Sequence, residues 1–431
     1  MPYKTLTFSD FGINKTATTL KNGLRVVIFE RKGSPLALRL CFLAGARFDP
    51  LGKEGLSHFT EHLIISGTKS YPSKDKLAMS IEELGGTISA FTSSEVLGVE
   101  IELGDASDLE HACEVLNEMI NASLVLPKMV ESERGATLSE LERRESNPEK
   151  MIGVLAKMLL YQGTDMGHPT IGTRESIAKI SREDVVSYIK NLLTSGRALL
   201  AISGEIEPTE AIKVIENSLN IPFSETLLPF EKLPILRNKS ISVKNYPSGQ
   251  VFLDLGFRTC SYFDKDELAL GGLASIIGGG RASRLVKKLR YERGLVYGAR
   301  CYSSCGYDSG EWGVETSTDK KNLPEVLKII AEVIDEAREG KITSDELDFA
   351  KARTIKSSKL STQTSMSWIR KHAYGELTGP NQYLNFPDFL NEISKISLDD
   401  IHQVAKKYLR NDSLYLTLCG PASEEEVKFE L

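Results

Sequence analysis

Residues 55–63 read Gly55-Leu56-Ser57-His58-Phe59-Thr60-Glu61-His62-Leu63. A helix over residues 55–65 would place His58 and His62 four residues apart. Both imidazole rings would then leave one face of the helix, about one turn from each other. Two imidazoles in that arrangement can bind a single zinc ion. This stretch is therefore the first candidate for a metal centre.

Glu61 completes the order His-x-x-Glu-His, which is typical of the inverzincin zinc peptidases. A carboxylate beside two zinc ligands, if it is not itself a ligand, can accept a proton from the attacking water and pass it to the leaving amine. The alternative is chance, because a pattern with three fixed positions recurs and histidine pairs on helices are often solvated or core residues. Other segments of the chain are needed to distinguish a zinc site from a chance match.

A catalytic zinc site usually has three protein ligands, so a further donor is needed. Residues 129–145 predict a helix, since they contain good helix formers and no proline. Glu133 and Glu140 lie seven residues apart, about two turns, and so share one face. One could bind zinc while the other holds a ligand histidine in place. A charged surface helix with ordinary Glu/Arg pairs explains the same residues. The spacing alone does not distinguish this explanation from zinc binding.

A resemblance to a known family distinguishes these two explanations. The segment 52–63, then Ser66-Gly67-Thr68, then Glu133-Arg134 with Glu140 seven residues later, resembles the pitrilysin and insulinase family. It is most similar to the short-chain branch, which includes the mitochondrial processing peptidases. The resemblance implies that Glu140 is the third zinc ligand and that Glu133 supports the site.

The second half of the chain carries another stretch that is similar to this family. It runs from Gly278-Gly279-Gly280-Arg281 to Leu289-Arg290-Tyr291-Glu292-Arg293-Gly294-Leu295-Val296-Tyr297. The resemblance implies that Arg290 and Tyr297 contact the bound peptide and the developing oxyanion. The residues themselves predict a helix from Ser283 to a left-handed C-cap at Gly294, followed by a strand that carries Tyr297. Without the resemblance, an exposed basic residue and a core aromatic explain the pair as well.

Residues 84–93 predict a strand after a Gly-Gly turn. They resemble the family's strand that pairs with substrate backbone, which implies substrate contacts by Ser89, Ala90 and Phe91. An exposed sheet edge can accept an extended peptide as an added strand. The family usually has asparagine where this chain has Ser89, so one side-chain contact is weakened. An ordinary sheet strand with a polar face is the other interpretation.

The composition is that of a soluble globular enzyme, with 431 residues, 41% of them hydrophobic, and a net charge of −6. That charge argues against a nucleic-acid partner and against an anionic membrane. We find no apolar run of about 18 residues and no leader-like start, so we expect a cytoplasmic protein. The scattered cysteines predict reduced core thiols. They are Cys41, Cys113, Cys260, Cys301, Cys305 and Cys419.

The order of elements predicts an α+β protein with two similar halves, each an antiparallel sheet packed against helices. Strands near 23–30 and 36–43 precede the zinc helix, and strands near 240–244 and 251–257 precede a helix over 266–277 that lacks histidine. The expected division is therefore 1–219 as the zinc-binding catalytic half, 220–237 as a proline-containing linker, and 238–431 as the half with the Arg/Tyr pair.

These observations predict a zinc-dependent endopeptidase with one Zn²⁺ per chain, held by His58, His62 and Glu140, and with Glu61 as the base. The resemblance implies a closed chamber that admits unfolded or short peptides, and a homodimer. A heterodimer with a related inactive subunit stays open. The alternative function is a catalytically silent structural or peptide-binding subunit of a heteromeric complex.

Overall fold

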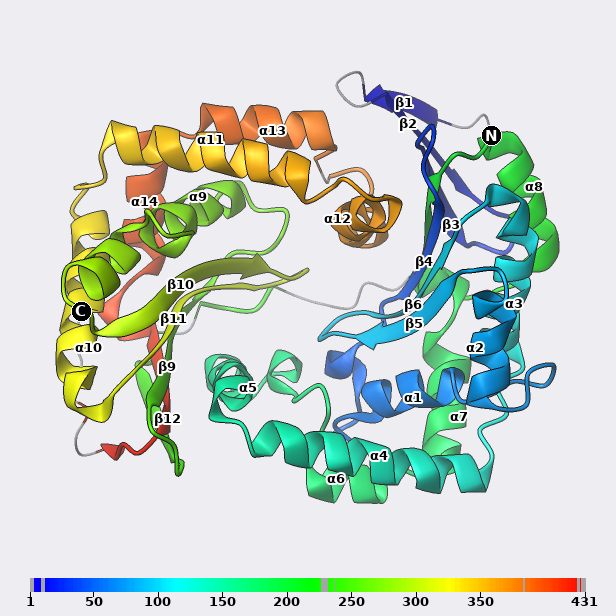
Figure 1. Cartoon of the computed structure of the whole chain (residues 1–431), viewed down its shortest axis with the longest axis horizontal. Helices are drawn as coiled ribbons and strands as arrows, with labels where there is room; N and C mark the ends of the chain where they lie inside the picture. Colours follow the sequence, from blue (N-terminus) through cyan, green and yellow to red (C-terminus); the bar gives the residue numbers. More distant parts are fainter. Residues whose placement is uncertain are drawn as a thin grey trace. The chain divides into compact units, whose positions relative to one another are not determined.

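The chain forms two compact units in the computed structural model, which describes residues 4–8, 12–225, 232–235, 237–382, 384–424 and 427 (Figure 1). Unit 1 comprises Met1–Leu141, His168–Leu228 and Lys359–Pro387. Unit 2 comprises Glu142–Gly167, Pro229–Ser358 and Asp388–Leu431.

The units depart from the linear division expected from the sequence in two segments. Residues 142–167 belong to unit 2 and residues 359–387 belong to unit 1. Each segment contributes a helix that covers one face of the sheet in its unit: α5 (Pro148–Leu160) packs on strands of unit 2, and α12 (Ser365–Thr378) packs on strands of unit 1. Local sequence patterns do not predict non-local packing of this kind.

Unit 1 is built on a sheet with the strand order β1-β2-β3-β7-β4-β6-β5 in the described part of the chain. Its strands are β1 (Lys4–Phe8), β2 (Ile13–Thr19), β3 (Arg25–Glu30), β4 (Leu36–Phe42), β5 (Thr87–Thr92), β6 (Leu97–Leu103) and β7 (Ala198–Gly204). Its helices, besides α12, are α1 (Leu56–Ile64), α2 (Lys74–Glu82), α3 (Leu109–Asn121), α4 (Pro127–Glu145), α6 (Arg174–Lys179), α7 (Arg182–Leu192) and α8 (Pro208–Ser218).

Unit 2 is built on a sheet with the order β10-β11-β9-β12-β8. The strands are β8 (Ser240–Asn245), β9 (Val251–Thr259), β10 (Val296–Cys305), β11 (Gly310–Thr318) and β12 (Leu414–Gly420). The helices, besides α5, are α9 (Glu267–Gly278), α10 (Leu323–Arg338), α11 (Ser344–Leu360), α13 (Phe386–Lys395) and α14 (Leu398–Tyr408). A π-helical segment runs over Val286–Tyr291.

The two units repeat one topology. The order β3-β7-β4-β6-β5 of unit 1 corresponds to β8-β12-β9-β11-β10 of unit 2, and α1 and α9 each follow the third strand of that order. The expected α+β fold with two similar halves is confirmed. The sheets are not wholly antiparallel, however, since β3 pairs parallel with β7 and β8 pairs parallel with β12. In both units the parallel partner returns only after a long helical connection, which parallel pairing requires.

Each unit has its own apolar core. In unit 1 the core side chains come from β3, β4, β6 and the inner faces of α1, α3 and α7. In unit 2 they come from β9, β11 and β12 together with α9, α10 and α14. In both cases alternate strand residues point into this core, and the opposite sheet face is left for α12 or α5.

The remaining expectations concern the linker, the cysteines and the membrane. Residues 226–231 and 236 of the expected linker lie outside the described residues, as do 1–3 and 9–11 near the start, and the described linker residues form no helix or strand. All six cysteines are free thiols, and all except Cys305 are buried. None of the helices in the described part of the chain combines the length and apolar character needed to cross a bilayer.

Candidate metal centre

Helix α1 begins at a position that the surrounding backbone fixes tightly. Gly55 has φ +94°, and a Cβ there would lie 2.2 Å from the carbonyl oxygen of Ile171, so the position requires glycine. The buried carboxylate of Asp49 accepts hydrogen bonds from the backbone N–H groups of Gly55 (2.7 Å) and Ser57 (2.8 Å). These bonds satisfy donors of the first turn and set the direction in which the helix leaves.

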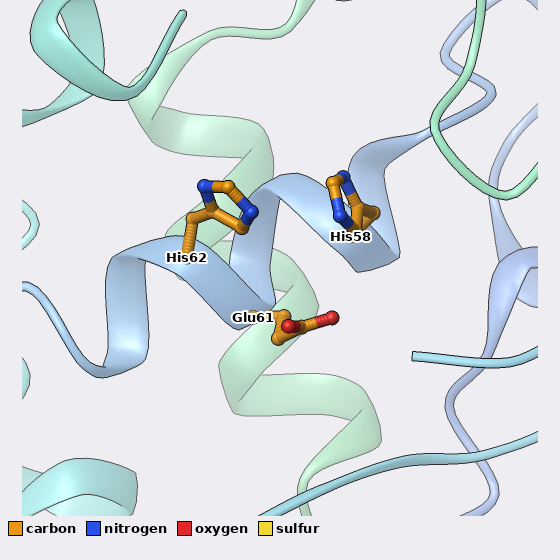
Figure 2. Close-up of side chains that lie close together, drawn as sticks. All are labelled: His58, Glu61 and His62. Atoms are coloured by element: carbon orange, nitrogen blue, oxygen red, sulfur yellow. The ribbon is translucent and has the colours of Figure 1, made fainter. Parts of the chain in front are cut away.

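His58 and His62 leave the same side of α1, as Figure 2 shows, with their ring centroids 4.6 Å apart. Glu61 projects from the helix beside them. Ligand atoms of the three side chains all lie within 4.8 Å of one another. The helical spacing read from the sequence therefore brings the three groups into one cluster.

Helix α4 presents two carboxylates to this cluster. Glu133 Oε2 lies 3.0 Å from His62 Nδ1, while Glu140 Oε2 lies 3.7 Å from His58 Nε2 and 3.8 Å from His62 Nε2. Val130, Thr137 and Leu141 form the buried side of α4. Arg134 of the same helix donates to the carbonyl oxygens of Ile177 and Ile180, which fixes the helix against the rest of unit 1.

The donor set fits a zinc ion. Zinc bonds of about 2.0–2.2 Å in a tetrahedron separate neighbouring ligand atoms by about 3.3–3.6 Å. The separations from Glu140 Oε2 to the two Nε2 atoms exceed this range by only a few tenths of an ångström. A carboxylate accepts, so His62 donates through Nδ1 to Glu133 and keeps the lone pair of Nε2 for a metal.

Two carboxylates, Glu61 and Glu140, lie within reach of the imidazoles, so the cluster alone does not assign the third ligand. The pKa of Glu61 is raised, chiefly by burial, although the Thr92 hydroxyl and His62 act in the opposite direction. The hydrogen bond between His62 and Glu133 raises the pKa of the histidine and lowers that of the carboxyl group.

Glu133 is further held by Ser66, whose hydroxyl lies 3.0 Å from Glu133 Oε1 and 2.7 Å from the backbone oxygen of His62. We predict that Glu133→Gln weakens zinc binding by about 10–100-fold, because the amide no longer holds the His62 ring as a charged acceptor does. Competition with a chromogenic chelator measures this effect. Glu131→Gln, an exposed change on the same helix, should bind zinc as the parent protein does. Equal zinc affinity in the two variants would show that Glu133 does not support the metal centre.

Strand β5, which carries Ser89, Ala90 and Phe91, is the last strand of the sheet of unit 1. It pairs only with β6 among the described strands, so its other side offers backbone N–H and C=O groups. Helix α1 packs against β5, and Thr92 at the end of the strand interacts with Glu61. The Phe91 ring is covered by the Arg39 guanidinium at 3.8 Å, so Phe91 offers its backbone more readily than its ring.

Arg290 and Tyr297 belong to unit 2, where they contact each other. The guanidinium carbon of Arg290 lies 4.8 Å from the centre of the Tyr297 ring, and Tyr297 is 83% exposed. The expected helix is present but is π-helical over Val286–Tyr291, and Gly294 adopts φ +63° as expected. A π-helical segment changes the rotation of the side chains that follow it, and local sequence patterns do not reveal it.

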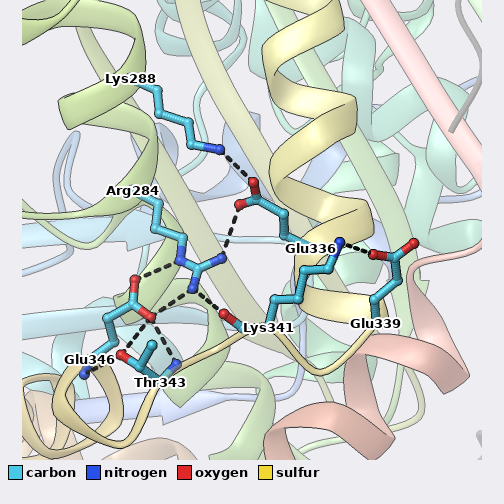
Figure 3. Close-up of polar contacts among 7 residues, drawn as sticks. All are labelled: Arg284, Lys288, Glu336, Glu339, Lys341, Thr343 and Glu346. Atoms are coloured by element: carbon cyan, nitrogen blue, oxygen red, sulfur yellow. Dashed lines mark hydrogen bonds and ion pairs between the residues drawn. The ribbon is translucent and has the colours of Figure 1, made fainter.

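A polar network anchors the start of this segment, as Figure 3 shows. Arg284 binds Glu346 through two nitrogen atoms (2.6 and 2.7 Å) and also contacts Glu336 at 3.0 Å, and Lys288 binds Glu336 at 2.7 Å. Burial alone would raise the pKa of Glu346, but Arg284 and the backbone of Thr343 lower it to about 2. The network thus ties the Arg290 segment to α10 and α11.

Sequence reasoning missed Asp49, Ser66, Thr92 and Arg284. Asp49 lies in an irregular turn before α1, where periodicity gives no signal. Ser66 lies four residues after His62, a spacing that could have indicated a contact on the same helical face. Thr92 and Arg284 act through partners distant in sequence.

Two family models match parts of this chain. A family model described as "Insulinase (Peptidase family M16)" matches residues 25–174, and one described as "Peptidase M16 inactive domain" matches residues 179–354. The chain is 26% identical over 434 residues to a Streptomyces coelicolor protein named "Uncharacterized zinc protease", covering 98% of this chain and 93% of that protein. It is 24% identical to the human mitochondrial-processing peptidase subunit beta, covering 94% and 84%.

A protease from Helicobacter pylori shares the fold. Its crystal structure superposes with a TM-score of 0.88 at 19% identity, covering 94% of this chain and 99% of that one. The fold of this chain is therefore found in a solved structure.

Proposed function

This chain belongs to the insulinase family of peptidases, family M16, and from that premise we propose that it is a zinc-dependent endopeptidase acting on unfolded or short peptides. His58, His62 and Glu140 would hold one zinc ion, and Glu61 would act as the general base. Relatives named as zinc proteases support the chemistry, and the residues of α1 and α4 support the assignment.

The observation that carries the proposal is the position of Glu140. Its Oε2 atom lies less than 4 Å from an Nε2 atom of each histidine, whereas Glu133 approaches only the far nitrogen of His62. One carboxylate thus suits coordination and the other suits orientation of a ligand. Because the family resemblance implies that Glu140 is the ligand, we assign proton transfer to Glu61.

Bound zinc would supply Lewis acidity toward the scissile carbonyl and lower the pKa of its water. Glu61 accepts a proton from the attacking water and delivers it to the leaving nitrogen. A pKa raised by burial suits this role, because a carboxylate that takes up a proton readily is the better base. Arg290 and Tyr297 offer a guanidinium and a phenol as donors to the peptide carbonyl and the developing oxyanion.

The free edge of β5 gives the peptide a place to bind. A substrate added as a further strand would pair with the backbone of Ser89, Ala90 and Phe91 and would pass Thr92, which interacts with Glu61. Such pairing requires an extended segment, so a folded protein is a poor substrate. Backbone pairing also makes binding tolerant of sequence.

We infer a homodimer in preference to a heterodimer with an inactive chain. Each chain carries both the metal centre and the Arg290/Tyr297 pair, so two identical chains supply every residue that the proposed site needs. A heterodimer with a related inactive chain is the other assembly, and the human relative is itself named as a subunit. The histidine pair of the metal centre occurs on α1 in unit 1, and α9, which corresponds to α1 in unit 2, has no histidine. One zinc ion per chain is therefore expected. A silent or purely peptide-binding subunit would leave the full His58-Glu61-His62 cluster without a role.

We predict that Arg290→Ala lowers kcat/KM by about 10–100-fold without releasing zinc, as expected for the loss of one donor to the substrate. Steady-state kinetics and metal analysis of the same samples test this. Arg293→Ala is the matched control, because Arg293 lies three residues away and pairs with Glu325 on the surface. Loss of zinc in Arg290→Ala would show that the residue is structural instead.

The substrate class is tested with one protein in two states. A disulfide-bonded protein and its reduced, alkylated form have the same sequence, and only the second is unfolded. Cleavage of the unfolded form alone supports an enzyme that pairs with extended chains in a closed chamber. Equal cleavage of the native form would refute that part of the proposal.

A further inference from the structure

Unit 2 contains a cavity of about 380 Å³ between α5 and the sheet. Leu253 and Leu255 of β9 point into the apolar core, so Asp254 between them points to the opposite face, where α5 packs. The space exists because the facing side chains are small. At Gly153 of α5 an added Cβ would meet no atom within 4 Å, and Gly256 lines the sheet side.

The inner wall of this cavity holds polar groups that the protein does not fully satisfy. Asp254 is 4% exposed and accepts hydrogen bonds from the Tyr302 hydroxyl at 2.9 and 3.1 Å, with no cation within 4 Å among the described residues. Thr417, which pairs with Asp254 across the sheet, is 1% exposed, and its hydroxyl has no hydrogen-bond partner in the described part of the chain. The Asp254 carboxylate and the Thr417 hydroxyl are therefore available to accept further hydrogen bonds from a ligand in the cavity.

The side chains that line the cavity include four carboxyl groups (Glu149, Asp254, Glu311 and Glu315) and three cations (Lys150, Lys157 and Arg300), so the carboxyl groups are in excess. Arg300 pairs with Glu315. Glu311 lines the wall without a hydrogen bond or ion pair to any described residue, although Arg258 lies directly opposite it on β9. The Arg258 guanidinium donates instead to the carbonyl oxygens of Leu160 and Pro234. Burial raises the pKa of Glu311 although Lys157 acts in the opposite direction. Burial also raises the pKa of Asp254 to about 7, against the opposing effects of Tyr302 and Arg300.

We propose that this cavity binds a small organic ammonium ion, with the nitrogen donating to Asp254 and Thr417 and the carbon chain lying against Ala156, Leu160 and Tyr415. A protonated amine has three donors and no acceptor, which matches a carboxylate and a hydroxyl oxygen. The cavity is far larger than a metal ion requires. Among the described residues, the only cluster of three ligand atoms close enough for a metal is the one on α1.

Titration of the full-length protein with putrescine, followed by calorimetry, tests the proposal without any peptide substrate, so its outcome is independent of the peptidase activity. Butane-1,4-diol, which has the same chain length and no charge, is the ligand control. We expect saturable binding of putrescine at one site, and at least about tenfold weaker binding of the diol. Equal binding of both, or no binding of putrescine at millimolar concentration, would overturn the proposal.

Two variants locate the site. Gly153→Leu places a side chain in the open space and should abolish binding with no loss of stability, because leucine is also the better helix former. Gly271→Leu is the matched control: this glycine also lies in a helix, α9, with no atom within 4 Å of an added Cβ, but it does not line the cavity. Thr417→Val should weaken binding while preserving shape. Binding that survives Gly153→Leu would show that putrescine binds elsewhere.

The affinity should also depend on pH. An ammonium ion binds the ionised form of Asp254, so the apparent affinity should rise about tenfold from pH 6 to pH 8, the ratio of carboxylate fractions for a pKa of about 7. Binding near pH 6 should release a proton, which titrations in buffers of different ionisation enthalpy detect. The titratable and charged groups lining the cavity around Asp254 are Arg300 and Tyr302 of β10, Glu311 and Glu315 of β11, Tyr415 of β12, and Glu149, Lys150 and Lys157 of α5. An affinity that falls with pH would contradict the role of Asp254.

Discussion

Replacing Glu61 with glutamine is expected to lower kcat by about 10²–10⁴-fold while leaving one zinc ion bound per chain. Glutamine has nearly the same shape as glutamate but cannot accept a proton at neutral pH. Glu61 is buried beside His58 and His62, so the variant should keep the fold of α1. Initial rates on a peptide substrate and metal content by mass spectrometry are the two measurements.

The control is Glu54→Gln, a carboxylate-to-amide change seven residues earlier, outside α1. It should keep both rate and zinc. An active Glu61→Gln protein would remove the general base from the mechanism. A protein that loses zinc on this change would make Glu61 a ligand instead.

Replacing Glu140 with glutamine is expected to have the opposite pattern, with loss of the metal first and of activity as a consequence. A neutral amide is a poor zinc ligand, so affinity should fall by more than the 10–100-fold typical of partners outside the coordination shell. The carboxylate lies 3.7 and 3.8 Å from the two Nε2 atoms in the structure. Metal content after gel filtration, and chelator competition, measure the change.

The pair of variants separates two carboxylates that the geometry alone leaves equivalent. Circular dichroism of Glu140→Gln should match that of the parent protein, because α4 is fixed by Arg134 and by its buried side, not by Glu140. Partial recovery of activity in excess zinc would support a weakened site. Full zinc occupancy in Glu140→Gln, with activity retained, would refute its role as a ligand.

Local patterns in the sequence predicted the parts of the fold that depend on neighbouring residues. The helices at 55–65, 129–145 and 266–277 correspond to α1, α4 and α9, because helical spacing and composition act over a few turns. The strand over 84–93 corresponds to β5, and its position at the sheet edge agrees with the expectation of an exposed edge.

Features that depend on distant packing were not predictable in this way. The exchange of residues 142–167 and 359–387 between units arises from helices that cover sheet faces formed elsewhere in the chain. The parallel pairs β3–β7 and β8–β12 join segments more than 160 residues apart, and nothing in either strand specifies the direction of its partner.

The residues of the candidate centre also fall into two groups, those that local spacing predicts and those that depend on distant packing. His58, Glu61 and His62 follow from spacing within one helix. Glu140 required the family resemblance, because α4 has several carboxylates and only the packing of α4 on α1 selects among them. The hydrogen bond from Ser66 to Glu133 and the contact of Thr92 with Glu61 arise from that packing too.

The most direct test of peptidase function is cleavage of a mixed library of unfolded peptides by the zinc-loaded protein, read by mass spectrometry beside Glu61→Gln. We predict cuts made by the parent protein and absent from the variant, whose pattern would also give the cleavage preference. Cuts made equally by both proteins would trace the activity to a contaminant or to another site. A zinc-bound parent protein that makes no cuts would contradict the proposal that this chain alone is an active peptidase.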